Sequence, residues 1–289
     1  SFIFFFFLFF LFSSIFQGSF LSFAQEEEEE PMSTSASAST STPCPASPPP
    51  PPKRAKVTEL RYAAREPSVS KINAFLQRAS ESPDLECLRL DKGYWSAEKV
   101  VDALVKCPKL EKLFICKHPM CAQAVDFDKI LLHVADHHPS LRLLAIMGYQ
   151  NCLSPHAHDM AYMLTNNTTL TTLILEGLNG DGHMDLMLHP LAKDNRTLRR
   201  LALCRMHLSA DSCDAIAKML QENTTLEYLD LSENPLGDLG CLLIAEANRG
   251  VKQLILQGCE IGDAGVYHLA RMVERTVVTK LDLLDNAEI

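Results

Sequence analysis

One short apolar pattern recurs nine times between residues 57 and 283, and it constrains the fold more than any other feature of the chain. Each copy reads apolar-x-x-Leu-x-apolar, as in Leu198-x-x-Leu201-x-Leu203. Successive copies begin 25 to 31 residues apart, which is a period typical of repeat solenoids. The nine copies begin at Val57, Leu85, Leu110, Leu141, Leu170, Leu198, Leu226, Val251 and Val278.

Each repeat divides into a strand-like part and a helix-like part. Within the six-residue pattern, apolar side chains alternate with other residues, which is the period of a strand with one buried face. Residues 209–222 then place Cys213, Ile216, Ala217 and Leu220 at the spacing of one buried helix face. Because one repeat cannot bury its own apolar face, neighbouring repeats must stack. The sequence predicts an α/β solenoid with a parallel β-sheet on the concave face and α-helices on the convex face.

Two repeats, residues 226–240 and 251–265, share a further pattern after the strand. Each has Asn or Cys, then one residue, then Leu or Ile followed by Gly-Asp-x-Gly. On these residues and on the period, the chain resembles ribonuclease-inhibitor-type leucine-rich-repeat proteins over residues 57–289. The resemblance implies a horseshoe in which Asn234 and Cys259 occupy a turn position that bridges neighbouring repeats. The 31-residue step after Leu110 predicts a local bulge or insertion. The equivalent turn positions of other repeats depart from the family pattern and hold Gly93, His118, Tyr149, Leu178 and Met206.

The resemblance also implies that the chain works by binding. We interpret it as a non-enzymatic scaffold, a monomer that holds a partner protein on its concave face. One alternative is a GTPase-activating regulator similar to the Ran GTPase-activating proteins. A second alternative is a secreted or cell-surface receptor ectodomain. Labelling of all ten cysteines under denaturing conditions would exclude an oxidised ectodomain.

No motif of a catalytic, cofactor or metal site stands out in the chain. The phosphate-binding, nucleophile-elbow and dinucleotide-binding glycine patterns are missing, and the glycine-rich residues 177–182 predict a turn. His133 and His137 have a spacing that can ligate zinc, but they lack the glutamate of a zinc protease motif. We expect both to lie on the outer side of a helix beside the buried Leu132. His189 is expected near the core of its helix.

The first 56 residues lack the repeat. Residues 1–31 combine an apolar stretch, residues 1–23, with a run of five glutamates, and they read either as a gene-model artefact or as a signal peptide. No membrane association is expected unless residues 1–23 are genuine. The last repeat pattern is not followed by a helix, so we expect the repeat domain, residues 57–289, to be truncated at its C-terminus.

Residues 32–56 are rich in serine, threonine and proline and predict a disordered linker. The linker ends in a basic cluster, Lys53, Arg54 and Lys56, which resembles a nuclear localisation signal. We therefore expect the protein in the nucleus or the cytoplasm rather than outside the cell.

Charge and cysteine content narrow the class of partner. The formal net charge of −9 disfavours nucleic-acid binding through phosphate contacts, which needs clustered lysine and arginine. The ten cysteines show no CxxC spacing and several fall on predicted core positions, so we expect free thiols. Glycosylation sequons within residues 166–169, 195–197 and 223–225 coincide with predicted helix-to-strand turns, where asparagine and threonine have local structural reasons to occur.

Side chains between the leucines of each strand should point into the concave face. They predict an apolar strip with a polar rim, which is a layout typical of protein interfaces. Arg200 and Tyr228, on adjacent strands, are the preferred anchors by residue type. The candidate partner-binding residues are Arg89, Lys112, Phe114, Leu143, Met147, Ile174, Glu176, Arg200, Tyr228 and Asp230.

Overall fold

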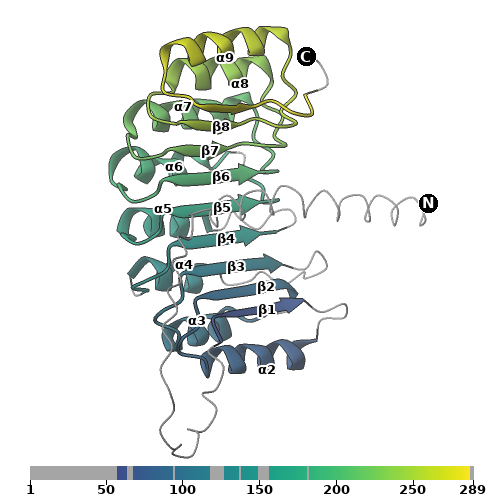
Figure 1. Cartoon of the computed structure of the whole chain (residues 1–289), viewed down its shortest axis with the longest axis vertical. Coiled ribbons are helices and arrows are strands. Elements are labelled where there is room, and N and C mark those ends of the chain that lie inside the picture. The colour runs from purple at the N-terminus through teal and green to yellow at the C-terminus, as the bar shows by residue number, and fades with distance from the viewer. Residues whose placement is uncertain are drawn as a thin grey trace, which may run out of the picture. The chain divides into compact units, whose positions relative to one another are not determined.

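A computed structural model describes residues 57–63, 68–93, 95–117, 127–136, 138–148, 156–180 and 182–286. In these ranges nine strands alternate with eight helices, and the strands form one parallel sheet in chain order (Figure 1). The predicted solenoid is therefore confirmed. The strands are β1 (Glu59–Ala63), β2 (Cys87–Gly93), β3 (Lys112–Lys117), β4 (Leu143–Met147), β5 (Thr172–Glu176), β6 (Arg200–Cys204), β7 (Tyr228–Asp230), β8 (Gln253–Ile255) and β9 (Lys280–Asp282). The helices are α2 (Val69–Ser80), α3 (Ala97–Lys106), α4 (Phe127–Asp136), α5 (Ala157–Asn166), α6 (Met184–Lys193), α7 (Ala210–Glu222), α8 (Gly237–Ala247) and α9 (Asp263–Arg275).

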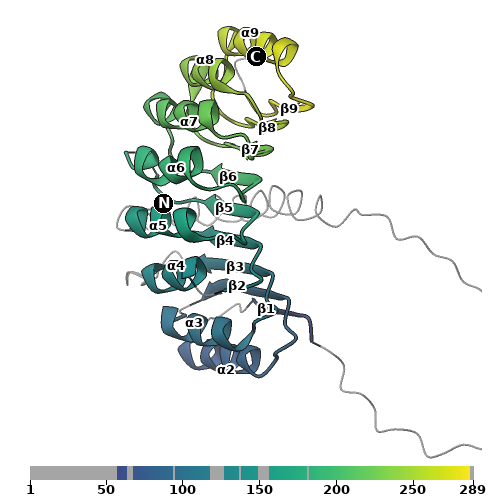
Figure 2. The ribbon, with the colours of Figure 1, turned by 90° about the vertical axis from the view of Figure 1, so that its left-hand side faces the viewer.

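The repeat unit, residues 54–289, has two layers. The helices cover one face of the sheet, and the strands line the inner side of the curve that the repeats describe (Figure 2). Each helix packs against the helix of the next repeat, as each strand pairs with the next strand. The face of the sheet that the helices do not cover is the concave face.

The core lies between these layers and is built from the repeated leucines. Leu173, Leu201 and Leu229, the central leucines of three successive strands, are fully buried. Burial of each such side chain stabilises the fold by about 1.5–3 kcal/mol. The stripe predicted within residues 209–222 is confirmed, since Cys213, Ile216, Ala217 and Leu220 are all buried in α7.

Two predictions about helix faces were wrong. Leu132 was expected to be buried, but it is 39% exposed because the core stripe of α4 runs through Ile130, Leu131 and Val134. His189 was expected near the core, but it is exposed: Leu188 and Leu191 take the buried positions on either side of it in α6.

A row of buried asparagines closes the turns that lead from helix to strand. In Asn167, Nδ2 donates to the carbonyl oxygen of Val134 in the preceding repeat (2.7 Å), and Oδ1 accepts from the backbone N–H of Leu170 (2.7 Å). Asn195 and Asn223 make equivalent contacts one and two repeats later. The sequence analysis predicted a structural role in turns for these asparagines, and the three side chains are indeed buried and hydrogen-bonded to backbone groups there. Asn166, also in a sequon, is exposed.

A second row of polar residues closes the turns after the later strands. Asn234 Oδ1 accepts from the backbone of Met206 (2.8 Å) and Nδ2 donates to Leu203 O (2.7 Å), so that one side chain joins two repeats. Cys259 takes the same position in the next repeat, and its thiol donates to Leu231 O (3.2 Å). The predicted bridging role of Asn234 and Cys259 is thus confirmed. Asn286 repeats the arrangement one repeat further on.

The remaining irregular positions fall into two groups. Leu178 and Met206 replace the polar turn residue by a buried apolar side chain. The register between β2 and β3 shifts after Leu90, which places a bulge one strand before the 31-residue step. His118, Tyr149 and the centre of the long step lie outside the described residues, so the predicted insertion stays a prediction.

Candidate functional site

Three columns of side chains cross the strands on the concave face. The parallel register aligns Phe114, Ala145, Ile174 and Ala202 in a middle column, with Arg89 before them and Asp230 after them. A first column, nearer the amino ends of the strands, runs through Lys112, Leu143, Thr172, Arg200 and Tyr228. A third column runs through Cys116, Met147, Glu176 and Cys204. All ten candidate residues therefore fall on this one face.

Two arginines stack on aromatic rings at opposite ends of this surface. The guanidinium carbon of Arg89 lies 4.0 Å from the centroid of the Phe114 ring, and that of Arg200 lies 4.3 Å from the Tyr228 ring. A stacked guanidinium is held flat while its N–H groups point outward in its own plane. Arg200 and Tyr228, chosen from the sequence as anchors, thus form one stacked pair.

An apolar strip runs from the ring of Phe114 toward the Arg200–Tyr228 pair, and we define it as Phe114, Leu143, Ala145, Met147, Ile174 and Ala202. None of the six is more than 5% exposed. They nevertheless lie apart from the core cluster that the helices cover. In a parallel sheet, neighbouring strands lie about 4.8 Å apart, so side chains in one column touch along its length.

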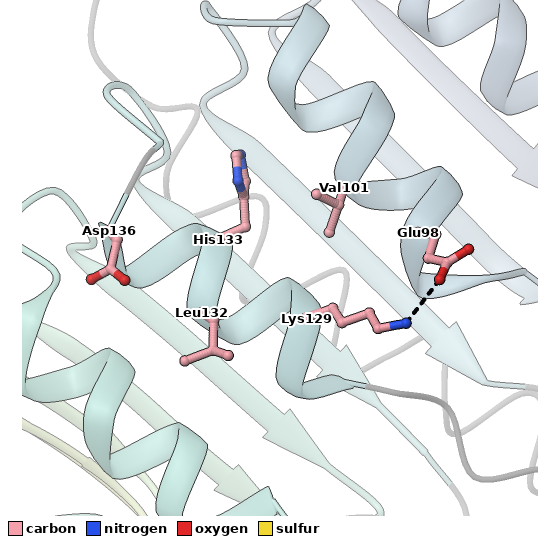
Figure 3. A pocket seen from close by; sticks show the side chains of 6 residues that line it. All are labelled: Glu98, Val101, Lys129, Leu132, His133 and Asp136. Carbon is pink, nitrogen blue, oxygen red and sulfur yellow. Dashed lines mark hydrogen bonds and ion pairs between the residues drawn. The ribbon is translucent and has the colours of Figure 1, made fainter.

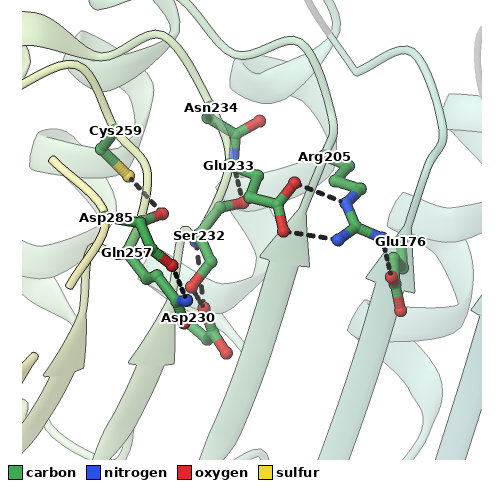
Figure 4. A network of polar contacts seen from close by, with 9 residues as sticks. All are labelled: Glu176, Arg205, Asp230, Ser232, Glu233, Asn234, Gln257, Cys259 and Asp285. Carbon is green, nitrogen blue, oxygen red and sulfur yellow. Dashed lines mark hydrogen bonds and ion pairs between the residues drawn. The ribbon is translucent and has the colours of Figure 1, made fainter. Parts of the chain in front are cut away.

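A network of charged residues lies where β5, β6 and β7 end (Figure 4). Arg205 Nη1 donates to Glu176 Oε1 (3.1 Å), while Arg205 Nε donates to Glu233 Oε2 (2.8 Å) and Nη2 to Glu233 Oε1. One guanidinium thus joins carboxylates from the repeats before and after its own. Asp230 lies beside the network and accepts from the Ser232 hydroxyl (2.5 Å) and the Tyr228 hydroxyl (3.3 Å).

Burial governs the protonation of this network. Burial raises the pKa of Glu176 to about 7; Arg205 opposes that rise, and the charges of Glu233 and Asp230 add to it. Burial also raises the pKa of Asp230, against the hydrogen bonds from Ser232. The pKa of the Cys204 thiol is raised well above its usual value by burial and by the nearby carboxylates. Burial therefore favours the neutral form of the Cys204 thiol.

The backbone explains why Arg205 and Glu233 can meet. Both have positive φ angles, 53° and 58°, and they follow the last concave residue of their repeats. Gly177 and Gly258 hold the same position with φ of 67° and 61°. At Gly177 a Cβ atom would lie 2.2 Å from Gly148 O, so glycine is required there. Sequence reasoning missed Arg205 and Glu233; the recurrence of glycine at this repeat position was the available signal.

The helical face offers a shallow pocket between α3 and α4. Val101, Leu132 and His133 line it together with Asp136, and the ion pair from Lys129 to Glu98 (2.9 Å) lies at one side (Figure 3). Other charges on this face are paired between successive helices, as Arg275 with Glu246 (2.9 Å). Such exposed pairs contribute little stability.

Several residues singled out from the sequence can be placed. Cys87, Cys107, Cys116, Cys204, Cys213, Cys241 and Cys259 are free thiols. In the described ranges, no group of three or more His, Cys, Asp or Glu side chains could hold a metal ion. Nor does any helix in those ranges have the length and apolar character needed to cross a bilayer. The basic cluster of Lys53, Arg54 and Lys56 lies outside the described residues, as do His137, Cys44, Cys121 and Cys152.

Comparison with known proteins gives matches to repeat proteins. The family profile described as Leucine Rich repeat matches residues 222–245 and 247–270. NACHT, LRR and PYD domains-containing protein 3 of Bos taurus is 35% identical over 131 residues, 43% of this chain and 13% of that protein. NACHT, LRR and PYD domains-containing protein 12 of Homo sapiens is 36% identical over 146 residues, 47% of this chain and 14% of that protein.

Ribonuclease inhibitor of Sus scrofa is 28% identical over 158 residues, 52% of this chain and 35% of that protein. A chain in the crystal structure of the Rad7 and Elc1 complex in yeast aligns with a TM-score of 0.47 and 16% identity, covering 80% of this chain and 64% of that chain. The aligned regions span 13 to 35% of the three curated relatives. The parallel nine-stranded sheet, its turn asparagines and these sequence matches together show a chain built of leucine-rich repeats similar to those of ribonuclease inhibitor.

Proposed function

We propose that this protein is a non-enzymatic scaffold that binds a partner protein on its concave face. The observation that carries the proposal is the alignment of an apolar strip between two stacked arginine–aromatic pairs on one continuous surface. Aromatic and arginine side chains are enriched among residues that dominate binding energy. An apolar centre with charged residues at its edge is the usual layout of such interfaces.

The contrast between the two faces supports the concave side. Across the helices, charges meet in ion pairs between successive repeats, as Lys129 with Glu98 and Lys193 with Glu222. On the concave face charges also pair between repeats, as Arg205 with Glu233, but here arginines stack on aromatic rings as well. Stacking on a ring holds the guanidinium in a fixed orientation, so its N–H groups are directional donors that suit recognition of one partner.

Two neighbouring arginines allow a matched test. Arg200 stacks on Tyr228, whereas Arg199 is an exposed residue that pairs with Glu227 at the amino edge of the sheet (3.1 Å). We expect Arg200→Ala to lower the affinity for the captured partner at least tenfold and Arg199→Ala to leave that affinity unchanged. Partners would be captured from cell extract, identified by mass spectrometry and rebound in purified form. Equal binding by both variants would contradict concave-face binding.

We further propose that the protein acts inside the cell. The support is that the seven cysteines within the described ranges are free, five of them buried, because reduced thiols persist in reducing compartments. Thiol labelling of denatured protein isolated under acidic quench should modify all ten cysteines of the chain. Labelling of markedly fewer would point to an oxidising compartment instead.

A further inference from the structure

The sign of charge changes along the concave face from one end of the solenoid to the other. In the middle column, Arg61 and Arg89 on β1 and β2 come first and the apolar residues of β3 to β6 follow. Asp230 and Asp282 then lie on β7 and β9, with Ile255 between them on β8. The two ends are not equivalent. The basic end is balanced, because Arg61 pairs with Asp91 (2.6 Å) and Arg89 with Glu59 (3.3 Å).

The opposite end carries an excess of carboxylates. We call it the acidic end and define it as Asp230, Glu233, Asp282 and Asp285, on or just after β7 and β9, together with Glu176, which lies on β5 and is joined to Glu233 through Arg205. Arg205 lies between two of the five, Glu176 and Glu233. The other three accept from uncharged donors: Asp230 from Ser232, Asp282 from the backbone of Leu284, and Asp285 from Gln257 (2.6 Å). Arg200 and Lys280 add two cations nearby, so acidic groups remain in the majority.

Repulsion within the acidic end is felt by its buried member. The pKa of Glu176 is raised first by burial and then by the charges of Glu233 and Asp230, although Arg205 lies against it. A positive group brought to this end would lower the energy of every carboxylate there. An apolar group would instead find its counterpart in the strip on β3 to β6, which continues directly into the acidic end.

We propose that the partner segment held on the concave face carries lysine or arginine side chains next to an apolar stretch, with its cations over β7 to β9 and its apolar residues over β3 to β6. This inference rests on the proposed concave-face binding and adds the chemistry and the direction of the bound segment. From β3 to β9 the surface spans six strand spacings, or about 29 Å. A helix of about 19 residues covers that length.

Three synthetic peptides of 18 residues test the inference with the full chain. The first is a helix former with leucines in one half of one face and lysines in the other half of the same face. The second replaces each lysine by glutamate. The third has the composition of the first, with leucine and lysine alternating along the face. We expect the first peptide to bind at least tenfold more tightly than the other two by fluorescence anisotropy, and its affinity to fall as salt rises.

Variants of the protein locate the binding. Asp282→Asn with Asp285→Asn should weaken the first peptide about tenfold, since both residues lie at the acidic end and outside the core. The matched control is Asp211→Asn with Asp214→Asn, two exposed carboxylates on α7, which should have no effect. Equal binding of the first and third peptides, or equal effects of the two double variants, would show non-specific charge attraction and overturn the inference.

Other occupants give different results. Tighter binding of the glutamate peptide would assign the face to an acidic segment and overturn the inference. A concentration-dependent rise in mass by analytical ultracentrifugation, abolished by Asp282→Asn with Asp285→Asn, would assign it to a second copy of the chain. Neither result contradicts concave-face binding itself, which fails separately if Arg200→Ala and Arg199→Ala capture the same partners equally.

Discussion

Arg205 and Glu233 form a two-point ion pair across neighbouring repeats while both residues hold left-handed backbone conformations. In the same row of turns, glycine serves at residues 177 and 258. A non-glycine residue in this conformation costs about 1 kcal/mol. The ion pair, which also reaches Glu176, offsets that cost and ties three consecutive repeats together.

Arg205→Ala should lower the free energy of unfolding by about 2 kcal/mol, because it leaves the buried Glu176 and its neighbour Glu233 without their cation. Arg205→Gly loses the same ion pairs but relieves the backbone, so it should be about 1 kcal/mol more stable than the alanine variant. Urea unfolding followed by circular dichroism measures both. Equal stability of the two variants would show that the φ of 53° carries no strain.

Glu176 should make the protein less stable as pH rises. Its pKa in the folded protein is about 7, above the usual value of 4.5, so the folded state binds more protons between these values. The stabilising effect is therefore complete below pH 4.5 and is lost as pH rises through 7. Glu176→Gln should match the parent near pH 4.5 and exceed its stability at pH 8. If the unfolding free energies of Glu176→Gln and the parent changed with pH in parallel, the raised pKa of Glu176 would be contradicted.

His138 should act in the opposite direction. It takes the place of the turn asparagines, and its Nδ1 accepts from the backbone of Leu141 (3.2 Å). Burial, and then the charge of His133, lower its pKa below 6.5, against backbone contacts with Cys107 and Leu104. The unfolded chain binds the proton more readily, so stability falls as pH drops below 6.5. His138→Asn should reduce the dependence of the melting temperature on pH between pH 7 and 5. An unchanged dependence would show that protonation of His138 is not its cause.

The adjacent residues Asn166 and Asn167 should respond differently to the same change. Asn167→Ala leaves the backbone of Val134, Thr169 and Leu170 without its partners in a buried turn and should cost about 2 kcal/mol. Asn166 is exposed and donates only within its own helix, so Asn166→Ala should cost less than 0.5 kcal/mol, roughly the range of surface substitutions. Chemical denaturation of both variants compares them. Similar losses would show that the buried turn tolerates unpaired backbone groups.

Leucine positions offer the strongest contrast in stability. Leu203 is fully buried on β6, so Leu203→Asp places a charge in the core and should cost more than about 3 kcal/mol. Leu239 on α8 is 57% exposed, and Leu239→Asp should leave the melting temperature within a few degrees of the parent. Differential scanning calorimetry measures both. A native-like melting temperature for Leu203→Asp would contradict the placement of the leucines.

The repeat pattern was enough to predict the sheet, its register and the concave columns. Phe114, Ala145 and Ile174 align as counted because the position of each residue within a repeat determines its place on a strand. Helix faces were harder to predict. A helix can rotate by one position when apolar residues are adjacent, which is why Leu131 rather than Leu132 enters the core. His189 shows the same ambiguity beside Leu188.

The charged network could not be predicted because it depends on backbone conformation. Arg205 and Glu233 follow the strands, where alternation ends and a left-handed residue turns the chain. No alternation pattern relates residues across that turn. Their ion pair follows from two left-handed conformations at a common repeat position, where Arg205 and Glu233 place opposite charges in successive repeats.

Asn286 has a practical consequence for where the chain can be cut. Its side chain accepts from the backbone of Cys259 and Ile261 and donates to Leu256. The turn after the strand of the eighth repeat is therefore completed by a residue of the ninth. An expression boundary drawn between these repeats would strip three interior backbone groups of their partners. Shortened versions meant for crystallisation should keep this residue, even if everything after it is removed.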